Sequence, residues 1–93
     1  MYFVTTIDSK DGDTRCVGYY STFEKANEAV LDNACDIWET CYDYAVIENI
    51  PEGLYQYDFK PIWYKWNDIE EIYEKIDERP TCIDKCLIGF AIG

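Results

Sequence analysis

The sequence predicts an α+β fold, in which a small antiparallel sheet of four to five strands packs on one main helix. Three observations predict this class. Short runs of β-branched and aromatic residues recur along the chain, one segment carries apolar residues at helical spacing, and turn residues separate these segments. The 93 residues fit a single domain over 1–93, because a chain of this length has room for one core. An apolar content of 48% excludes a disordered acidic tail.

The expected strands are short, and turn or cap residues bound several of them. Asp11-Gly12 suits a tight hairpin turn between the first two strands, and Pro51 ends the third. Because Pro61 lacks an amide donor, the fourth strand either lies at an edge or begins after the proline. Residues 54–58 form a connection or a short strand. The expected strands are 2–7 (YFVTTI), 14–20 (TRCVGYY), 44–50 (YAVIENI), 59–66 (FKPIWYKW) and 87–92 (LIGFAI).

One main helix is expected between the first hairpin and the third strand. Ser21 and Glu24 fit a capping box, in which the hydroxyl and the carboxylate each accept from a free backbone amide at the start of the helix. The apolar residues that follow recur at steps of three and four. The sequence therefore predicts a helix over 22–34, with a further helical turn over 36–40.

Residues 67–78 support two interpretations. Their apolar residues stand at i, i+3, i+4 and i+7, which favours a second short helix that ends before Pro80. The alternative is a strand that pairs with 63–66 in a hairpin and carries Ile72 and Ile76 on one face. We expect the helix.

Charge and cysteine content restrict the partners and the compartment. The chain contains nineteen acidic residues, eight basic residues and no histidine, so its net charge is −11. This charge disfavours direct binding to nucleic acid or to an anionic membrane, since both require clustered cations. Five cysteines are an odd number, and Met1 opens directly on a strand-like run without a basic leader. We expect a cytoplasmic protein with reduced thiols.

The residue types needed for catalysis or metal binding do not occur at suitable spacings. Without histidine, a serine or cysteine nucleophile lacks its usual base, and Cys16 beside Arg15 is the only weak candidate for a thiolate. The other cysteines do not have zinc-ligand spacing, and the acidic residues over 8–13 do not follow a calcium-binding loop. We expect no enzyme activity, no cofactor and no metal.

Acidic residues form two tracts that suggest a binding surface. One tract recurs every four residues on the expected helix, where neighbouring carboxylates repel by about 0.2–0.5 kcal/mol per pair. If the two tracts share a face, their charge density approaches that of a DNA strand, and the surface would attract a basic nucleic-acid-binding protein. The competing interpretation is a solvated acidic face. The candidate residues are Glu24, Glu28, Asp32 and Asp36 in the first tract, with Glu70, Glu71 and Glu74 in the second.

Aromatic residues suggest a second binding mode. Nine tyrosines, three tryptophans and four phenylalanines exceed what a core of this size requires. Surface tyrosine and tryptophan are typical of protein interfaces, so they favour an interaction module or a homodimer. A tyrosine-lined sponge for a small ligand is a further alternative. The candidate anchors are Tyr55, Tyr57, Trp63 and Trp66.

Five segments resemble small uncharacterised proteins of Firmicutes, their phages and mobile elements. They are YYSTFEKANEAVLDN (19–33), DIWE (36–39), YAVIENIPEGLY (44–55), IWY (62–64) and GFAIG (89–93). The resemblance implies, by provenance, size and charge, an inhibitor of host-defence nucleases in the bacterial cytoplasm, with anti-CRISPR proteins as the model. The partner would then be a basic nucleic-acid-binding protein such as a CRISPR effector. The resemblance assigns no role to any single residue.

Overall fold

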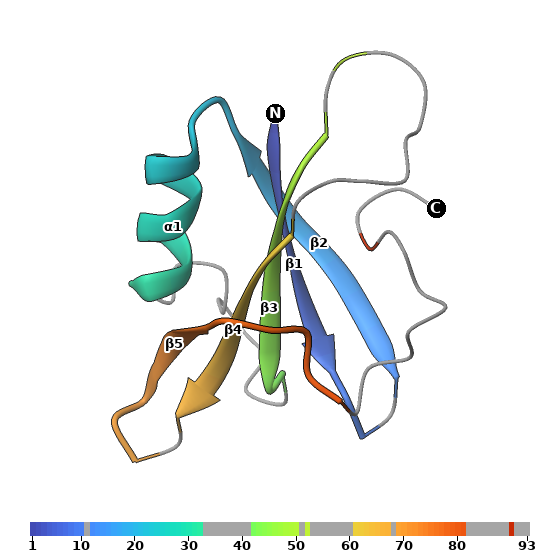
Figure 1. Cartoon of the computed structure of the whole chain (residues 1–93), viewed down its shortest axis with the longest axis vertical. Coiled ribbons are helices and arrows are strands. Elements are labelled where there is room, and N and C mark those ends of the chain that lie inside the picture. Colours follow the sequence, from blue (N-terminus) through green and yellow to red (C-terminus); the bar gives the residue numbers. More distant parts are fainter. Residues whose placement is uncertain are drawn as a thin grey trace.

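A computed structural model describes residues 1–10, 12–32, 42–50, 52, 61–67, 69–81 and 90. In this part of the chain, five strands form one antiparallel sheet in the order β2-β1-β3-β4-β5, and one helix contacts the sheet (Figure 1). The predicted α+β class, with one main helix and a sheet of four to five strands, is confirmed. The elements are β1 (Tyr2–Asp8), β2 (Asp13–Tyr20), α1 (Phe23–Leu31), β3 (Tyr44–Asn49), β4 (Ile62–Asn67) and β5 (Ile72–Ile76).

The expected second helix over 67–78 is wrong, and the hairpin alternative is confirmed. β4 and β5 pair antiparallel through five residue pairs, from Trp63↔Ile76 to Asn67↔Ile72. The side chain of Asn67 holds the turn: its Oδ1 accepts from the amides of Ile69 (3.0 Å) and Glu70 (3.2 Å). Glu71 then reverses the chain with φ of +56°, a left-handed conformation that ends any helix.

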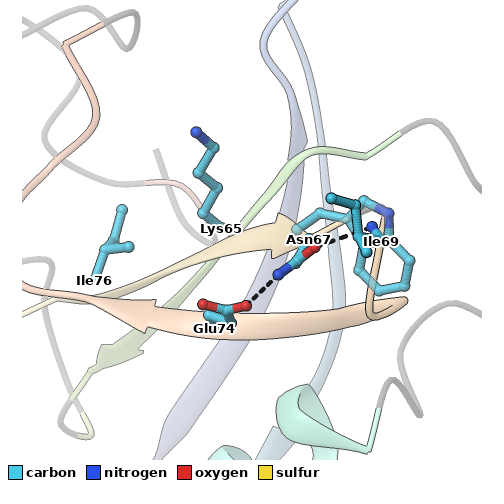
Figure 2. Close-up of a pocket in the computed structure, with 6 residues that line it drawn as sticks. Lys65, Asn67, Ile69, Glu74 and Ile76 are labelled. Carbon is cyan, nitrogen blue, oxygen red and sulfur yellow. Dashed lines mark hydrogen bonds between the residues drawn. The ribbon is translucent and has the colours of Figure 1, made fainter.

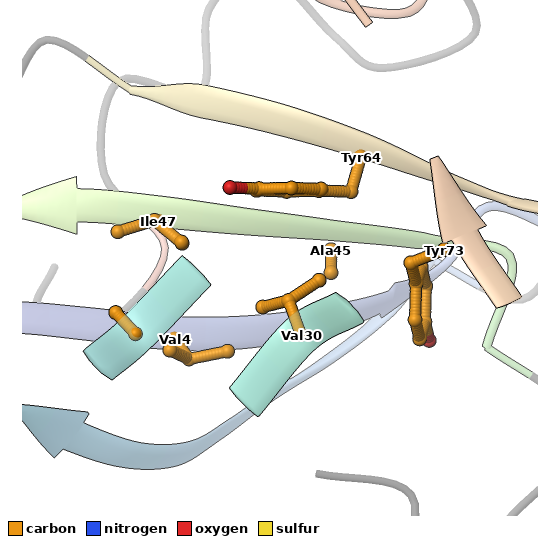
Figure 3. Close-up of a cluster of buried hydrophobic side chains, with 7 residues drawn as sticks. Val4, Val30, Ala45, Ile47, Tyr64 and Tyr73 are labelled. Atoms are coloured by element: carbon orange, nitrogen blue, oxygen red, sulfur yellow. The ribbon is translucent and has the colours of Figure 1, made fainter. Parts of the chain in front are cut away.

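Alternation along the strands divides the core between the two faces of the sheet. The face under α1 carries the larger cluster, which we call the helix-side core (Figure 3). The opposite face carries a smaller cluster, the far-side core, against which Phe90 packs. The helix-side core comprises Val4, Ala26, Val30, Ala45, Ile47, Tyr64 and Tyr73. The far-side core comprises Ile7, Val46 and Trp63.

Several expected segments lie outside the described residues. They are the helical turn over 36–40, the connection over 54–58 and the strand over 87–92, of which only Phe90 is described. In the described part of the chain, no helix has the length and apolar character needed to cross a membrane.

α1 begins one residue later than the sequence predicts. Thr22 has an extended backbone (φ −129°, ψ 152°), and its side chain accepts from the Lys25 amide at 3.3 Å, so Thr22 and not Ser21 is the N-cap. Both residues are hydroxyl-bearing, and sequence spacing alone does not decide between them. The cap fixes where the apolar face of α1 meets the sheet.

Replacing Thr22 with alanine is expected to lower the free energy of unfolding by about 1 kcal/mol, because the Lys25 amide loses its acceptor. The matched change Ser21→Ala is expected to stay within ~0.5 kcal/mol of wild type, since Ser21 is exposed and precedes the cap. Urea denaturation followed by circular dichroism measures both. Equal losses in the two variants would contradict the assignment of the cap.

Candidate partner-binding surfaces

The outward face of α1 carries the described part of the first acidic tract, whose fourth residue, Asp36, lies outside the described residues. Residues Ala26, Ala29 and Val30 of α1 are buried against the sheet. Steps of four residues turn about 40° around a helix of 3.6 residues per turn. Glu24, Glu28 and Asp32 therefore lie along one line opposite the buried face, and all three are exposed. The structure brings these three predicted residues together, and we call them the acidic stripe.

The acidic stripe is electrostatically unfavourable for the helix itself. Glu24 lies in the first turn, where the helix dipole favours a negative charge. Asp32 caps the opposite end, where the dipole disfavours it, and no basic residue lies in the last turn of α1. Lys25 is the only cation in α1. The stripe therefore weakens the helix slightly while it gives the surface a concentrated negative charge.

The second acidic tract divides between two places on the β4–β5 hairpin. Glu70 and Glu71 lie in the turn. Tyr73 belongs to the helix-side core, so the next residue, Glu74, faces the other side of the sheet. The Glu74 carboxylate accepts from Nδ2 of Asn67 on that side (Figure 2). The condition that both tracts share one face thus fails for Glu74, because strand alternation replaced the helical periodicity that we expected.

Of the four predicted aromatic anchors, the structure buries one, Trp63. Trp63 is 3% exposed and belongs to the far-side core, so its placement on the surface is wrong. Trp66 is half-buried and packs edge-on against Tyr73, with 5.0 Å between the ring centroids. Tyr55 and Tyr57 lie outside the described residues. The physical reason for Trp63 is that β4 begins after Pro61 and lies inside the sheet, between β3 and β5.

Sequence reasoning missed an exposed apolar surface on the β4–β5 hairpin. Ile69 in the turn is 93% exposed, and Ile72 is 41% exposed. Beside them lies a hollow of about 500 Å³ (Figure 2). In a hairpin over these residues, positions 65 and 67 of the first strand share one face of the sheet with positions 72, 74 and 76 of the second. Choosing the hairpin would therefore have predicted this surface. The hollow is lined by Lys65, Trp66, Asn67, Ile69, Glu74 and Ile76.

Buried polar groups connect separate elements of the fold. The Tyr64 hydroxyl donates to Oδ1 of Asn27 at 2.5 Å, which ties α1 to β4. Burial raises the pKa of Tyr64 to about 12, so its hydroxyl stays protonated. Glu48 is 1% exposed, and its carboxylate oxygens accept from the Phe90 amide at 3.1 and 3.2 Å.

Within the described residues, no three histidine, cysteine, aspartate or glutamate side chains are placed to hold a metal ion. Asp43 accepts from the amide (2.9 Å) and the hydroxyl of Ser9, which joins β3 to the end of β1. Asp8 accepts from the Lys10 amide at 3.1 Å within the first turn. Cys16 is exposed on β2 as a thiol. These groups have structural partners in the turns and strands where they lie.

No protein family, curated protein or solved structure matches this chain. No role is therefore carried over from another protein, and the resemblance to small phage and mobile-element proteins stays a prediction.

Proposed function

We propose that this protein is a non-enzymatic inhibitor or modulator that docks the acidic stripe of α1 on the basic surface of a nucleic-acid-binding protein. The observation that carries the proposal is the alignment of Glu24, Glu28 and Asp32 on the exposed face of α1, directly away from the sheet. Burial of Ala26, Ala29 and Val30 fixes that orientation. The stripe is therefore a pre-ordered array of charge, and binding requires little ordering of the helix.

The acidic stripe alone carries about half the charge density of one DNA strand. Residues four apart rise by about 6 Å along a helix, so three carboxylates extend over about 12 Å. Phosphates on one DNA strand follow each other every ~3.4 Å, so the stripe matches about every second phosphate. Arginine and lysine side chains in a nucleic-acid groove could pair with it. The net charge of −11 adds long-range attraction that speeds the encounter.

The partner class follows from this charge pattern together with the resemblance. A basic groove that holds nucleic acid is the complementary surface, and host-defence nucleases, CRISPR effectors among them, present such grooves. The protein would compete with the nucleic acid for that groove. Glu70 and Glu71 in the hairpin turn add negative charge at a second place.

The test is displacement of a labelled DNA duplex from a panel of purified defence nucleases, with a CRISPR effector included. Wild-type protein is expected to displace the DNA from at least one member. The variant Glu24→Gln/Glu28→Gln/Asp32→Asn is expected to need about tenfold more protein, because three exposed pairs contribute ~0.5 kcal/mol each. Displacement is also expected to weaken as salt rises from about 50 to 200 mM.

A matched control separates the stripe from net charge. The variant Asp13→Asn/Glu52→Gln/Glu78→Gln also neutralises three exposed acids, all of them outside α1. It is expected to displace DNA within about twofold of wild type. Equal losses in both triple variants would show that only net charge acts, and displacement that is independent of salt would exclude the electrostatic mechanism.

A further inference from the structure

The turn of the β4–β5 hairpin presents an isoleucine to solvent. Ile69 is 93% exposed, the highest value among the large apolar side chains in the described part of the chain. Ile72, which follows the turn, is 41% exposed. A single exposed apolar side chain is common on protein surfaces and implies nothing by itself. The order of the turn and the charges around Ile69 are the observations that carry an inference.

Hydrogen bonds from Asn67 order the turn in the absence of a partner. Its Oδ1 accepts from the amides of Ile69 (3.0 Å) and Glu70 (3.2 Å), and its main-chain oxygen accepts from the Glu71 amide at 2.8 Å. Its Nδ2 donates to the carboxylate of Glu74 (Figure 2). Glu71 holds a left-handed φ of +56°, which costs free energy for a residue with a Cβ and none for glycine. Because the turn is already ordered, little conformational freedom is lost when Ile69 binds a partner.

The charges around Ile69 indicate the chemistry of that partner. Glu70 and Glu71 follow Ile69 directly, and both are exposed. Residues 66–74 contain no basic residue. A pocket that takes up Ile69 brings these two carboxylates against its rim, so a cationic rim attracts the turn and an acidic rim repels it. A second copy of this chain is a poor partner, because its net charge of −11 repels the turn.

The hairpin turn lies on the same side of the molecule as the acidic stripe. Figure 1 shows the turn beyond the C-terminal end of α1, where the stripe ends at Asp32. α1 also contacts β5 of the hairpin. A groove that holds about ten base pairs extends over ~34 Å. The longest dimension of this protein is 39 Å, so a single groove is long enough to meet both the stripe and the turn.

We propose that Ile69 is the apolar anchor of the protein on its partner: it inserts into an apolar pocket beside the basic groove, and Glu70 and Glu71 pair with cations at the rim of that pocket. The inference rests on the proposed function and adds a second contact to it. The two contacts act at different stages. The acidic stripe attracts the partner over a distance and speeds association, whereas Ile69 makes contact only after docking and slows dissociation.

The experiment uses the full chain and the panel nuclease whose DNA the wild type displaces. The nuclease is immobilised, and surface plasmon resonance measures the association and dissociation rates of each variant. Ile69→Ser removes the anchor, and Ile69→Leu keeps an apolar side chain of the same size. The matched control is Tyr19→Ser, which removes a 63% exposed side chain from β2, at the opposite edge of the described sheet. Circular dichroism checks that all variants are folded.

We expect Ile69→Ser to raise the dissociation rate about tenfold, because burial of an isoleucine side chain changes an equilibrium constant by about ten- to a hundredfold. Its association rate should stay within about twofold of wild type. Ile69→Leu and Tyr19→Ser should dissociate within about threefold of wild type. Between about 50 and 200 mM salt, the loss caused by Ile69→Ser should persist, whereas the loss in the acidic-stripe triple variant should shrink with screening.

The outcomes distinguish this inference from the proposed function. Wild-type dissociation of Ile69→Ser, together with a loss in the acidic-stripe triple variant, overturns the anchor and keeps the proposed function. A loss in Ile69→Ser alone supports the anchor and removes the stripe from the contact. Displacement of no DNA by the wild type overturns both. Equal losses in Ile69→Ser and Tyr19→Ser, or in Ile69→Ser and Ile69→Leu, overturn the anchor, as does sedimentation that shows a dimer lost on Ile69→Ser.

Discussion

Replacing Trp63 with alanine is expected to lower the free energy of unfolding by about 3–5 kcal/mol. Trp63 is 3% exposed and is the largest side chain of the far-side core. The Phe90 ring packs on it edge-on, with 5.3 Å between centroids, and the Arg79 guanidinium lies 5.5 Å from the Trp63 ring. The substitution removes these contacts and leaves a cavity, which is a large loss for a domain whose total stability is of the order of 5–15 kcal/mol.

Urea denaturation followed by far-ultraviolet circular dichroism measures this effect. The matched control is Trp66→Ala on the same strand. Trp66 is half-buried at the edge of the helix-side core, so its removal is expected to cost about half as much or less. A larger loss for Trp66→Ala than for Trp63→Ala would contradict the burial of Trp63.

Raising the pH above 10 is expected to destabilise the protein by up to about 3 kcal/mol through Tyr64 alone. Burial raises the pKa of Tyr64 from 10.0 to about 12 in the folded state. Above pH 10 the unfolded chain releases this proton and the folded chain does not, so unfolding becomes more favourable. The stabilisation is complete below pH 10 and is lost as the pH rises to about 12, at about 1.4 kcal/mol per pKa unit.

The comparison of wild type with Tyr64→Phe isolates this effect from other alkaline titrations. At pH 8 the variant should be less stable by about 1 kcal/mol, because Asn27 loses the hydrogen bond from the Tyr64 hydroxyl. Between pH 10 and 12 the wild type should lose stability more steeply than the variant. Tyr19→Phe is the control, since Tyr19 is 63% exposed and should follow the wild-type curve. Parallel curves for wild type and Tyr64→Phe would contradict the raised pKa.

The elements that depend on local patterns could be predicted from the sequence. The three-and-four spacing of apolar residues gave the buried face of α1, and with it the outward line of Glu24, Glu28 and Asp32. Strand composition and the Asp11-Gly12 turn gave the β1–β2 hairpin. The observed N-cap of α1 lies one residue after the predicted one, because Thr22 and Ser21 both carry a hydroxyl group that can cap a helix.

The parts that depend on which strands become neighbours could not be predicted in the same way. Ile72 and Ile76 stand four residues apart, which is consistent with one face of a helix and with one face of a strand. Tertiary pairing with β4 decides between them. That pairing also buries Trp63, turns Glu74 away from α1 and leaves Ile69 exposed, so three errors about the site have one origin.

The opposite orientations of Trp63 and Trp66 give each face of the sheet its own optical reporter. Trp63 belongs to the far-side core, and Trp66 packs against the helix-side core. The third tryptophan, Trp38, can be replaced by phenylalanine so that only these two emit. Fluorescence that is shielded from quenchers in water then comes from Trp63 and reports on the far face. Fluorescence that such quenchers reduce comes from Trp66 and reports on the face beneath α1. Loosening of one layer could then be told apart from loosening of the other within a single polypeptide.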